Sequence, residues 1–172
     1  MNMLRRIYHH VWRLIALFLV NKLFAGTNPN FFRFKRCLLQ SIGFTIGKNT
    51  KIVGPVSCTG KLTIGTNCWI GANLVIRGNG CVNIGDNVDV GPDVTFLTGT
   101  HEIGLWKRRA GKGYNCVQSI GNGCWIGAKS VFVNNVSVGA SSVVAATACV
   151  CKNTPPNVLI GGVPAKIIKK LE

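Results

Sequence analysis

Along most of this chain an aliphatic or aromatic residue, often followed by glycine, recurs every six residues. This period fits neither an α-helix, whose side chains repeat about every 3.6 residues, nor a flat strand, whose side chains repeat every two. It fits a chain that turns a corner every six residues and closes a triangular coil in about 18. Glycine is expected to supply positive φ at these corners. The repeating residues are Ile46, Ile52, Ile64, Ile70, Ile76, Ile84, Val90, Phe96, Ile120, Ile126, Phe132, Val138, Val144 and Val150.

This pattern predicts an all-β solenoid, a parallel β-helix of stacked coils with strands about 4.8 Å apart. The rhythm is interrupted twice. The step from Ile76 to Ile84 is eight residues, so two residues are inserted there. The step from Phe96 to Ile120 keeps the phase, but residues 102–119 lose the pattern. We predict that they form a loop outside the coil, and a long polar loop on a regular scaffold usually carries function.

The first 42 residues differ from the rest and predict helices. In residues 3–24 apolar residues at helical spacing are surrounded by basic ones, and the longest apolar run, Leu14–Val20, is far shorter than the roughly 20 residues that a membrane span needs. The long, bulky chain ahead of this run disfavours a cleaved signal peptide. We expect a helix in the plane of an anionic membrane, at its cytoplasmic face. Packing against the solenoid or another subunit is the alternative. A second short helix at 31–42 would cap the coil.

The remaining sequence divides into a solenoid domain at 43–158 and a C-terminal strand with a basic tail at 159–172. The 20 Lys and Arg against 5 Asp and Glu give a net charge of +15, which indicates an anionic partner. Nucleic acid is not expected, because no helix-turn-helix, zinc-finger or RNA-binding signature is visible. The eight cysteines contain no CxxC pair, so we expect no metal site. Small buried hydrophobes in a reducing compartment explain them better.

His101 is the only histidine outside the N-terminal helix, and it stands where the coil gives way to the loop. A neutral imidazole can take a proton from a hydroxyl, so His101 is a candidate general base. Glu102 is adjacent and is a candidate for orienting it, although neighbours on an extended strand point to opposite faces. Two further loop residues, Arg108 and Arg109, are candidates for binding an acidic or pyrophosphate-linked acceptor.

Three stretches carry a resemblance: IGDNVDVGPDVTFLTGTH at 84–101, IGNGCWIGA at 120–128 and PPNVLIGGVPAKIIKK at 155–170. They resemble the hexapeptide-repeat acyltransferases, most closely the galactoside, maltose and polysaccharide O-acetyltransferases. The resemblance covers roughly residues 43–170. It implies a left-handed parallel β-helix, acetyl-CoA as acyl donor and a homotrimer with active sites between subunits. It also implies a sugar acceptor, and together with the basic, apolar N-terminus this favours a surface polysaccharide or its lipid-linked precursor. We therefore expect a cytoplasmic enzyme, peripheral at the inner face of the membrane through its N-terminal helix.

The resemblance also assigns roles to residues. His101 would be the base on the acceptor hydroxyl, with a backbone N–H stabilising the oxyanion. The family's Asn and Asp near the acceptor sugar correspond here to Gly71 and Asn79, so Asn79 is the expected acceptor contact. Cys151 replaces a common Thr before the CoA-site lysine. The expected CoA contacts are Trp125 and Ala128 on the pantetheine arm, the Ala146 amide, and Lys152, Lys166 and Lys169 near the phosphates.

Other functions are known on solenoids of this kind. A γ-class carbonic anhydrase needs three zinc-binding histidines, and the repeat region holds one. A non-catalytic scaffold would not need the loop, and an ice-binding solenoid would show rows of threonine. An N-acyltransferase acting on an amino sugar, or a serine O-acetyltransferase, stays open beside the sugar O-acetyltransferase.

Overall fold

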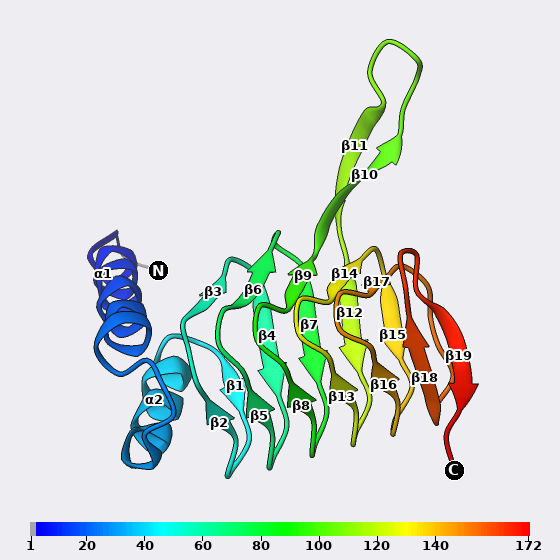
Figure 1. The fold of residues 1–172 in the computed structure, drawn as a ribbon. Helices are drawn as coiled ribbons and strands as arrows, with labels where there is room; N and C mark the ends of the chain where they lie inside the picture. The colour runs from blue at the N-terminus through cyan, green and yellow to red at the C-terminus, as the bar shows by residue number, and fades with distance from the viewer. Residues whose placement is uncertain (1–2) are drawn as a thin grey trace.

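The computed structural model describes residues 3–172, in which three parallel sheets wind into a solenoid whose N-terminal end is covered by helices (Figure 1). The first sheet contains β1 (Thr45–Ile46), β4 (Lys61–Ile64), β7 (Cys81–Ile84), β12 (Val117–Ile120) and β15 (Val136–Val138). The second contains β2 (Lys51–Ile52), β5 (Trp69–Ile70), β8 (Asp89–Val90), β13 (Trp125–Ile126), β16 (Val143–Val144), β18 (Val158–Gly161) and the antiparallel β19 (Lys166–Lys170). The third contains β3 (Val56–Cys58), β6 (Leu74–Arg77), β9 (Thr95–Leu97), β14 (Val131–Val133) and β17 (Cys149–Val150).

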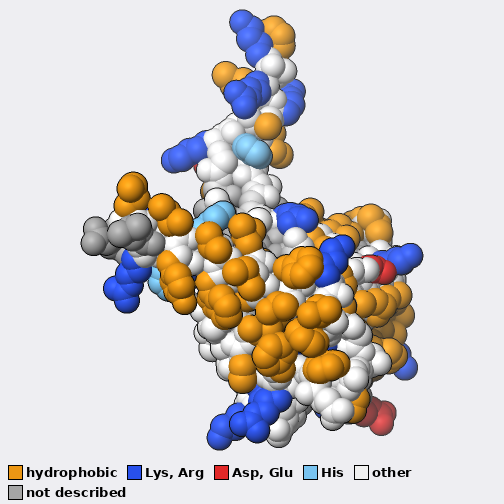
Figure 2. All heavy atoms as spheres, turned by 90° about the vertical axis from the view of Figure 1, so that its left-hand side faces the viewer, with side chains coloured by type: hydrophobic (Ala, Val, Ile, Leu, Met, Phe, Trp, Pro, Cys, Tyr) orange, Lys and Arg blue, Asp and Glu red, His pale blue; other side chains and the backbone are white. Residues whose placement is uncertain are grey.

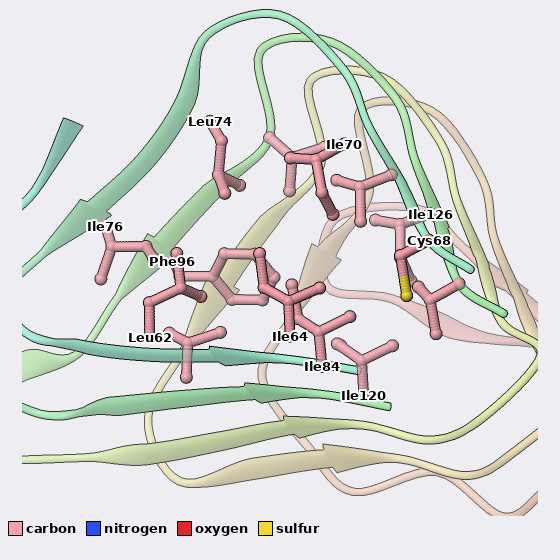
Figure 3. Packing of buried hydrophobic residues seen from close by; sticks show 14 of the residues in the cluster. Leu62, Ile64, Cys68, Ile70, Leu74, Ile76, Ile84, Phe96, Ile120 and Ile126 are labelled. Atoms are coloured by element: carbon pink, nitrogen blue, oxygen red, sulfur yellow. The ribbon is translucent and has the colours of Figure 1, made fainter. Parts of the chain in front are cut away.

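The predicted parallel β-solenoid is confirmed. All fourteen residues of the six-residue pattern are buried, none more than 4% exposed. They stack in register, since Ile64 pairs with Ile84 and Ile84 with Ile120. Figure 3 shows these three side chains beside one another in the core, with Ile70 and Ile126 grouped on another side. The column of stacked side chains therefore follows directly from the sequence period.

Glycine plays a different part from the one expected. The left-handed corner position is the third residue after the buried aliphatic one and is filled mostly by Asn or Asp, such as Asn67 (φ 55°) and Asp93 (φ 60°), whose short polar side chains tolerate this conformation. The glycine that follows the aliphatic residue instead lets neighbouring coils approach. A Cβ on Gly71 would lie 2.7 Å from the carbonyl carbon of Gly91, which no side chain permits.

The long interruption is a β-hairpin that projects from the coil (Figure 1). Its strands are β10 (Gly99–Ile103) and β11 (Ala110–Asn115). The coil closes beneath it, because the Cys116 N–H donates to the Thr98 carbonyl at 2.7 Å. The loop was predicted to continue to residue 119, but β12 already belongs to the coil. The strand was missed because Gln118, a polar residue, occupies a core position. Gln118 is fully buried between Val82 and Val136 of the neighbouring coils, and its Nε2 donates to the Leu97 and Asn134 carbonyls at 3.0 Å each.

The N-terminal segment forms α1 (Met3–Phe18), a π-helical turn η1 (Leu19–Leu23) and α2 (Pro29–Ser41). The second helix begins two residues earlier than predicted, since Asn28 caps it by accepting from the Asn30 N–H at 3.1 Å and Pro29 suits the first helical position. Lys35 of α2 is fully buried and donates to the Gly26 and Val53 carbonyls at 2.8 and 3.0 Å. Within residues 3–172, no helix has the length and apolar character needed to cross a bilayer.

Candidate functional site

The two interruptions of the repeat meet at one place in the structure. The inserted residues around Asn79 lie against the base of the hairpin, where the Gly80 N–H donates to the buried Thr98 hydroxyl at 3.3 Å and the Thr98 N–H donates to the Arg77 carbonyl at 2.7 Å. Between them is a hollow of about 300 Å³, called here the hairpin-base hollow. Its lining residues are Gly78, Asn79, Gly99, Thr100, His101, Gly113, Tyr114 and Asn115.

His101 lies on β10 at the edge of this hollow, and its side chain is exposed. It pairs across the hairpin with Gly113, where an added Cβ would be 3.6 Å from both Cδ2 and Nε2 of the imidazole. The ring therefore lies across a residue that has no side chain, and it lines the hollow. Because Asn79 lines the same hollow, the structure brings two of the predicted site residues together. A hydroxyl bound there would be within reach of the imidazole.

Glu102 is the next residue on the same strand and is also exposed. Strand alternation directs its side chain away from the face that carries His101, although the hairpin register shifts just after that residue. In the described part of the chain no hydrogen bond joins the Glu102 carboxylate to the imidazole. The described structure therefore contains no contact through which Glu102 would orient the His101 ring.

Arg108 and Arg109 lie at the tip of the hairpin, beyond the last strand pair, Ile103 with Ala110. Arg109 donates from Nη1 to the Gly104 carbonyl at 3.3 Å. Three residues of extended strand separate His101 from Gly104, which is roughly 10 Å at about 3.3 Å per residue. Within one chain the two arginines are therefore not brought to the hairpin-base hollow.

The predicted CoA residues lie on the coils that follow the hairpin. Trp125 of β13 is 61% exposed and faces outward from the second sheet. Its strand register runs to Val143, then to Leu159, and finally to Lys169 on β19. Three apolar side chains in a row thus end at a cation, which suits a ligand with an apolar arm and a phosphorylated end. We call this row the Trp125 strip; its two middle residues were not recognised from the sequence, although Val143 follows Trp125 by one coil length.

Ala128 and Ala146 occupy successive coils at the edge between the second and third sheets, where the Thr147 N–H donates to the Ala128 carbonyl at 2.8 Å. The Ala146 N–H donates none of the backbone hydrogen bonds found among residues 3–172, so it is free for a ligand. Lys152 and Lys166 are exposed near the last coil, with Lys166 following Ala165, whose N–H donates to the Cys149 carbonyl at 2.8 Å. The final coil therefore gathers the cations that phosphates require.

The two halves of the site lie on different edges of one chain. The hairpin leaves between the third and first sheets, after β9 and before β12, whereas Ala128 and Ala146 lie between the second and third. One solenoid does not place His101 over the Trp125 strip. Among residues 3–172 there is also no group of three His, Cys, Asp or Glu side chains arranged to hold a metal ion.

No protein-family model matches the chain. It is 33% identical over 150 residues to the galactoside O-acetyltransferase of Escherichia coli, covering 86% of this chain and 74% of that protein. It is 29% identical over 153 residues to a putative colanic acid biosynthesis acetyltransferase of the same organism, covering 86% and 81%.

Among solved structures, a galactoside acetyltransferase in complex with coenzyme A matches with a TM-score of 0.79 at 29% identity, covering 96% of this chain and 82% of that one. A hexapeptide-repeat acetyltransferase of Vibrio cholerae, complexed with acetyl-CoA, matches with a TM-score of 0.73 at 25% identity, covering 96% and 88%.

Proposed function

The chain belongs to the hexapeptide-repeat acetyltransferases and uses acetyl-CoA as its acyl donor, and from this premise we propose that its acceptor is a sugar hydroxyl. The sugar belongs to a surface polysaccharide or its lipid-linked precursor. The similarity to a galactoside and a putative colanic acid acetyltransferase supports this choice. The observation that carries it is the hairpin-base hollow, in which an open imidazole stands among the polar side chains of Asn79, Thr100, Tyr114 and Asn115.

In the proposed reaction His101 is the general base. Its imidazole takes the proton of the acceptor hydroxyl as the oxygen attacks the thioester carbonyl. The imidazolium then returns this proton to the departing thiolate, so that the products are the acetyl ester and free CoA. A backbone N–H would stabilise the oxyanion between these steps. No acyl-enzyme forms, since the histidine only carries the proton. We assign Glu102 at most a secondary, positioning part.

Donor binding is assigned to the Trp125 strip and the final coil. The Trp125 side chain and the Ala128 edge would line the pantetheine arm, and the free Ala146 N–H would donate to it. Lys152, Lys166 and Lys169 would pair with the phosphates, whose charge suits ammonium groups.

The separation of the two half-sites supports a homotrimer. In a side-by-side packing of three prisms, the hairpin of one subunit reaches the Trp125 strip of the next, and Arg108 and Arg109 at its tip then approach an acceptor held between subunits. Light scattering gives the oligomeric state.

Mixing His101→Ala subunits with Trp125→Ala subunits, after dissociation and reassembly, should restore part of the activity that each variant lacks, because some sites regain both residues. No recovery, or a monomer that turns over, would contradict a shared site.

The direct test of the function is release of CoA thiol from acetyl-CoA across neutral sugars, acidic sugars, amino sugars and serine. We expect release with sugar hydroxyls and a product whose acetyl group is removed by mild alkali, as an ester is. An alkali-stable acetyl amide would establish the N-acyltransferase alternative, and a preference for serine the serine O-acetyltransferase. Absence of release with every acceptor would favour a non-catalytic scaffold.

We place the enzyme in the cytoplasm. All eight cysteines are unpaired, which suits a reducing compartment. Burial raises the pKa of the Cys68 and Cys124 thiols, so both behave as inert core side chains.

A further inference from the structure

The helix α1 has an inner face that is firmly attached to the end of the solenoid. Trp12 donates from Nε1 to the Ser41 hydroxyl at 2.9 Å, and Arg13 donates from Nη2 to the Cys58 carbonyl at 2.8 Å. Ala16 of α1 and Val20 of the following turn η1 are completely buried in the core cluster. Since these contacts fix the rotation of the helix about its axis, the direction of its opposite face is also fixed.

The opposite face of α1 is apolar and uncovered. Its side chains recur at the spacing i, i+4, i+7, i+8 and i+11, which forms one continuous stripe. Five large hydrophobic residues make up this outer face, each 44–60% exposed: Ile7, Val11, Leu14, Ile15 and Phe18. Figure 2 looks directly at this end of the molecule and shows hydrophobic side chains gathered over it, with lysine and arginine at the margins. Nothing within residues 3–172 covers the stripe.

The charge around this face has one sign. The first 85 residues contain no Asp or Glu and 11 Lys or Arg, whereas all five acidic residues follow. Arg5 and Arg6 are exposed at the start of α1, and Lys22 is exposed just after its end. Leu23, 63% exposed, and Phe34, 43% exposed, extend the apolar surface onto η1 and α2. An apolar stripe bordered by cations is the composition that binds an anionic lipid surface.

We infer that the outer face of α1 docks in the plane of an anionic lipid bilayer. The apolar side chains enter the boundary between headgroups and acyl chains, and Arg5, Arg6 and Lys22 meet lipid phosphates. A helix of 16 residues, about 24 Å long, is too short to span and long enough to lie in the surface. The absence of acidic residues from this half of the sequence favours lipid over a second copy of the same basic end, which would repel it.

This docking sets the height of the reaction above the membrane. Because α1 and α2 cover the end of the stack, the solenoid rises from the bilayer with its coils parallel to the surface (Figure 1). The hairpin leaves the coil that contains β8 and β9. This coil lies two strand spacings beyond β2, which is about 10 Å, and the layer of helices beneath β2 adds about another 10 Å. His101 then works roughly 20 Å above the lipid, on a sugar carried outward from its anchor. This consequence rests on the proposed function, whereas the docking does not.

The test is sedimentation of the full-length protein with phosphatidylcholine vesicles and with vesicles of phosphatidylcholine mixed with phosphatidylglycerol. We expect binding to the mixed vesicles at low salt, weakening as salt is raised, and little binding to phosphatidylcholine alone. The double variant Leu14→Asp/Phe18→Asp should lower the partition coefficient by about 100-fold or more, since it places charge on the stripe that enters the lipid. The matched control is Ile103→Asp/Leu105→Asp, which changes net charge equally at hairpin residues that are 89% and 81% exposed; it should bind nearly as the parent does.

The charged border has its own pair of variants. Arg5→Gln/Arg6→Gln should weaken binding to the mixed vesicles about 30-fold, since two cations at the surface contribute about 1 kcal/mol each. Lys61→Gln/Lys129→Gln, with the same loss of charge on exposed coil residues, should not. Circular dichroism and the melting temperature confirm that each variant is folded.

Three outcomes would overturn the inference. The first is a folded protein that binds neither kind of vesicle, and the second is equal binding to both. The third is a lower oligomeric state of the Leu14→Asp/Phe18→Asp variant in the absence of vesicles, which would make this face of α1 a protein interface. Acetyl transfer to a small soluble sugar, measured in parallel, separates this result from the proposed function. Transfer without vesicle binding removes only the docking, whereas vesicle binding without transfer removes only the function.

Discussion

The coil and the hairpin are built from consecutive β-strands of one chain, yet they differ in what holds them. In the coil, Phe96 and Phe132 belong to the coils before and after the hairpin, are fully buried, and stack with ring centroids 4.5 Å apart. In the hairpin, Ile103, Leu105 and Trp106 are 75–89% exposed. The hairpin is held by its own strand pairing and by the closure of the coil at Thr98 and Cys116.

This difference shows how a repeat protein can carry chemistry on an insertion. The coil keeps its register across the detour, because β7 pairs directly with β12 on the far side. Closing a loop of this length costs little additional chain entropy. Substitutions in the coil should therefore change stability, whereas substitutions in the hairpin should change the reaction and leave stability almost unaltered.

Phe96→Ala should have the largest effect. Removing a fully buried ring leaves a cavity between stacked coils, so the free energy of unfolding should fall by about 3–5 kcal/mol, measured by urea denaturation. Ile103→Ala, on the hairpin, should stay within about 0.5 kcal/mol of the parent. Similar losses for both would mean that the hairpin is packed against part of the assembly.

His101→Ala should show the opposite behaviour. Without the base, turnover should fall by about 100-fold or more, while the melting temperature and the affinity for acetyl-CoA stay unchanged. Glu102→Gln, one residue along the strand, should retain activity within a few-fold, because that side chain is directed away from the imidazole. A loss as large as that of His101→Ala would show that the carboxylate positions the base, and near-normal activity of His101→Ala would refute its role.

The third prediction assigns acceptor binding to the hairpin and acetyl-CoA binding to the last coil. Arg108→Gln/Arg109→Gln on the hairpin should raise the KM for the acceptor about tenfold and spare that for acetyl-CoA, as charge-assisted hydrogen bonds to the acceptor are lost. Lys152→Gln/Lys169→Gln on the last coil should do the reverse. Steady-state kinetics with each substrate varied in turn give both constants. If the arginine pair weakens acetyl-CoA binding, or changes neither constant, the hairpin tip has no acceptor role.

The smallest predicted effect concerns the helical end of the coil. Burial lowers the pKa of Lys35 from its model-compound value of 10.5. Between the lowered pKa and 10.5 the unfolded chain binds more protons than the folded one, so stability rises with pH there, by at most about 1.4 kcal/mol per pH unit. Below the folded pKa both states hold the proton and this dependence vanishes.

Lys35→Met should remove that rise. The measurement is the difference in unfolding free energy between the two proteins across this pH range, because buried cysteines with raised pKa act in the opposite direction in both. Parallel curves would show that the Lys35 ammonium is well solvated by its carbonyl partners and does not titrate there.

The sequence by itself determined the coil. Each buried position is predicted by an apolar residue and its spacing of six from the preceding one. The inward orientation of side chains such as Ile70 and Ile126 therefore follows from nearby residues in the sequence alone. The hairpin was visible as a loss of rhythm, and His101 as the histidine beside it. The two N-terminal helices and the cationic last coil also followed from local composition. These features depend on chain-local spacing, which the sequence records directly.

Only the tertiary structure decided what lies beside what. Gln118 fills a core slot because carbonyls from two other coils accept its hydrogen bonds. The insertion at Asn79 meets the hairpin base, and Trp125 aligns with Lys169, through strand pairing between residues far apart in the chain. Inserted residues shift the count along the sequence without shifting the stacking of the coils. Neighbourhood across coils is therefore set by backbone hydrogen bonding and close packing, which no local pattern specifies.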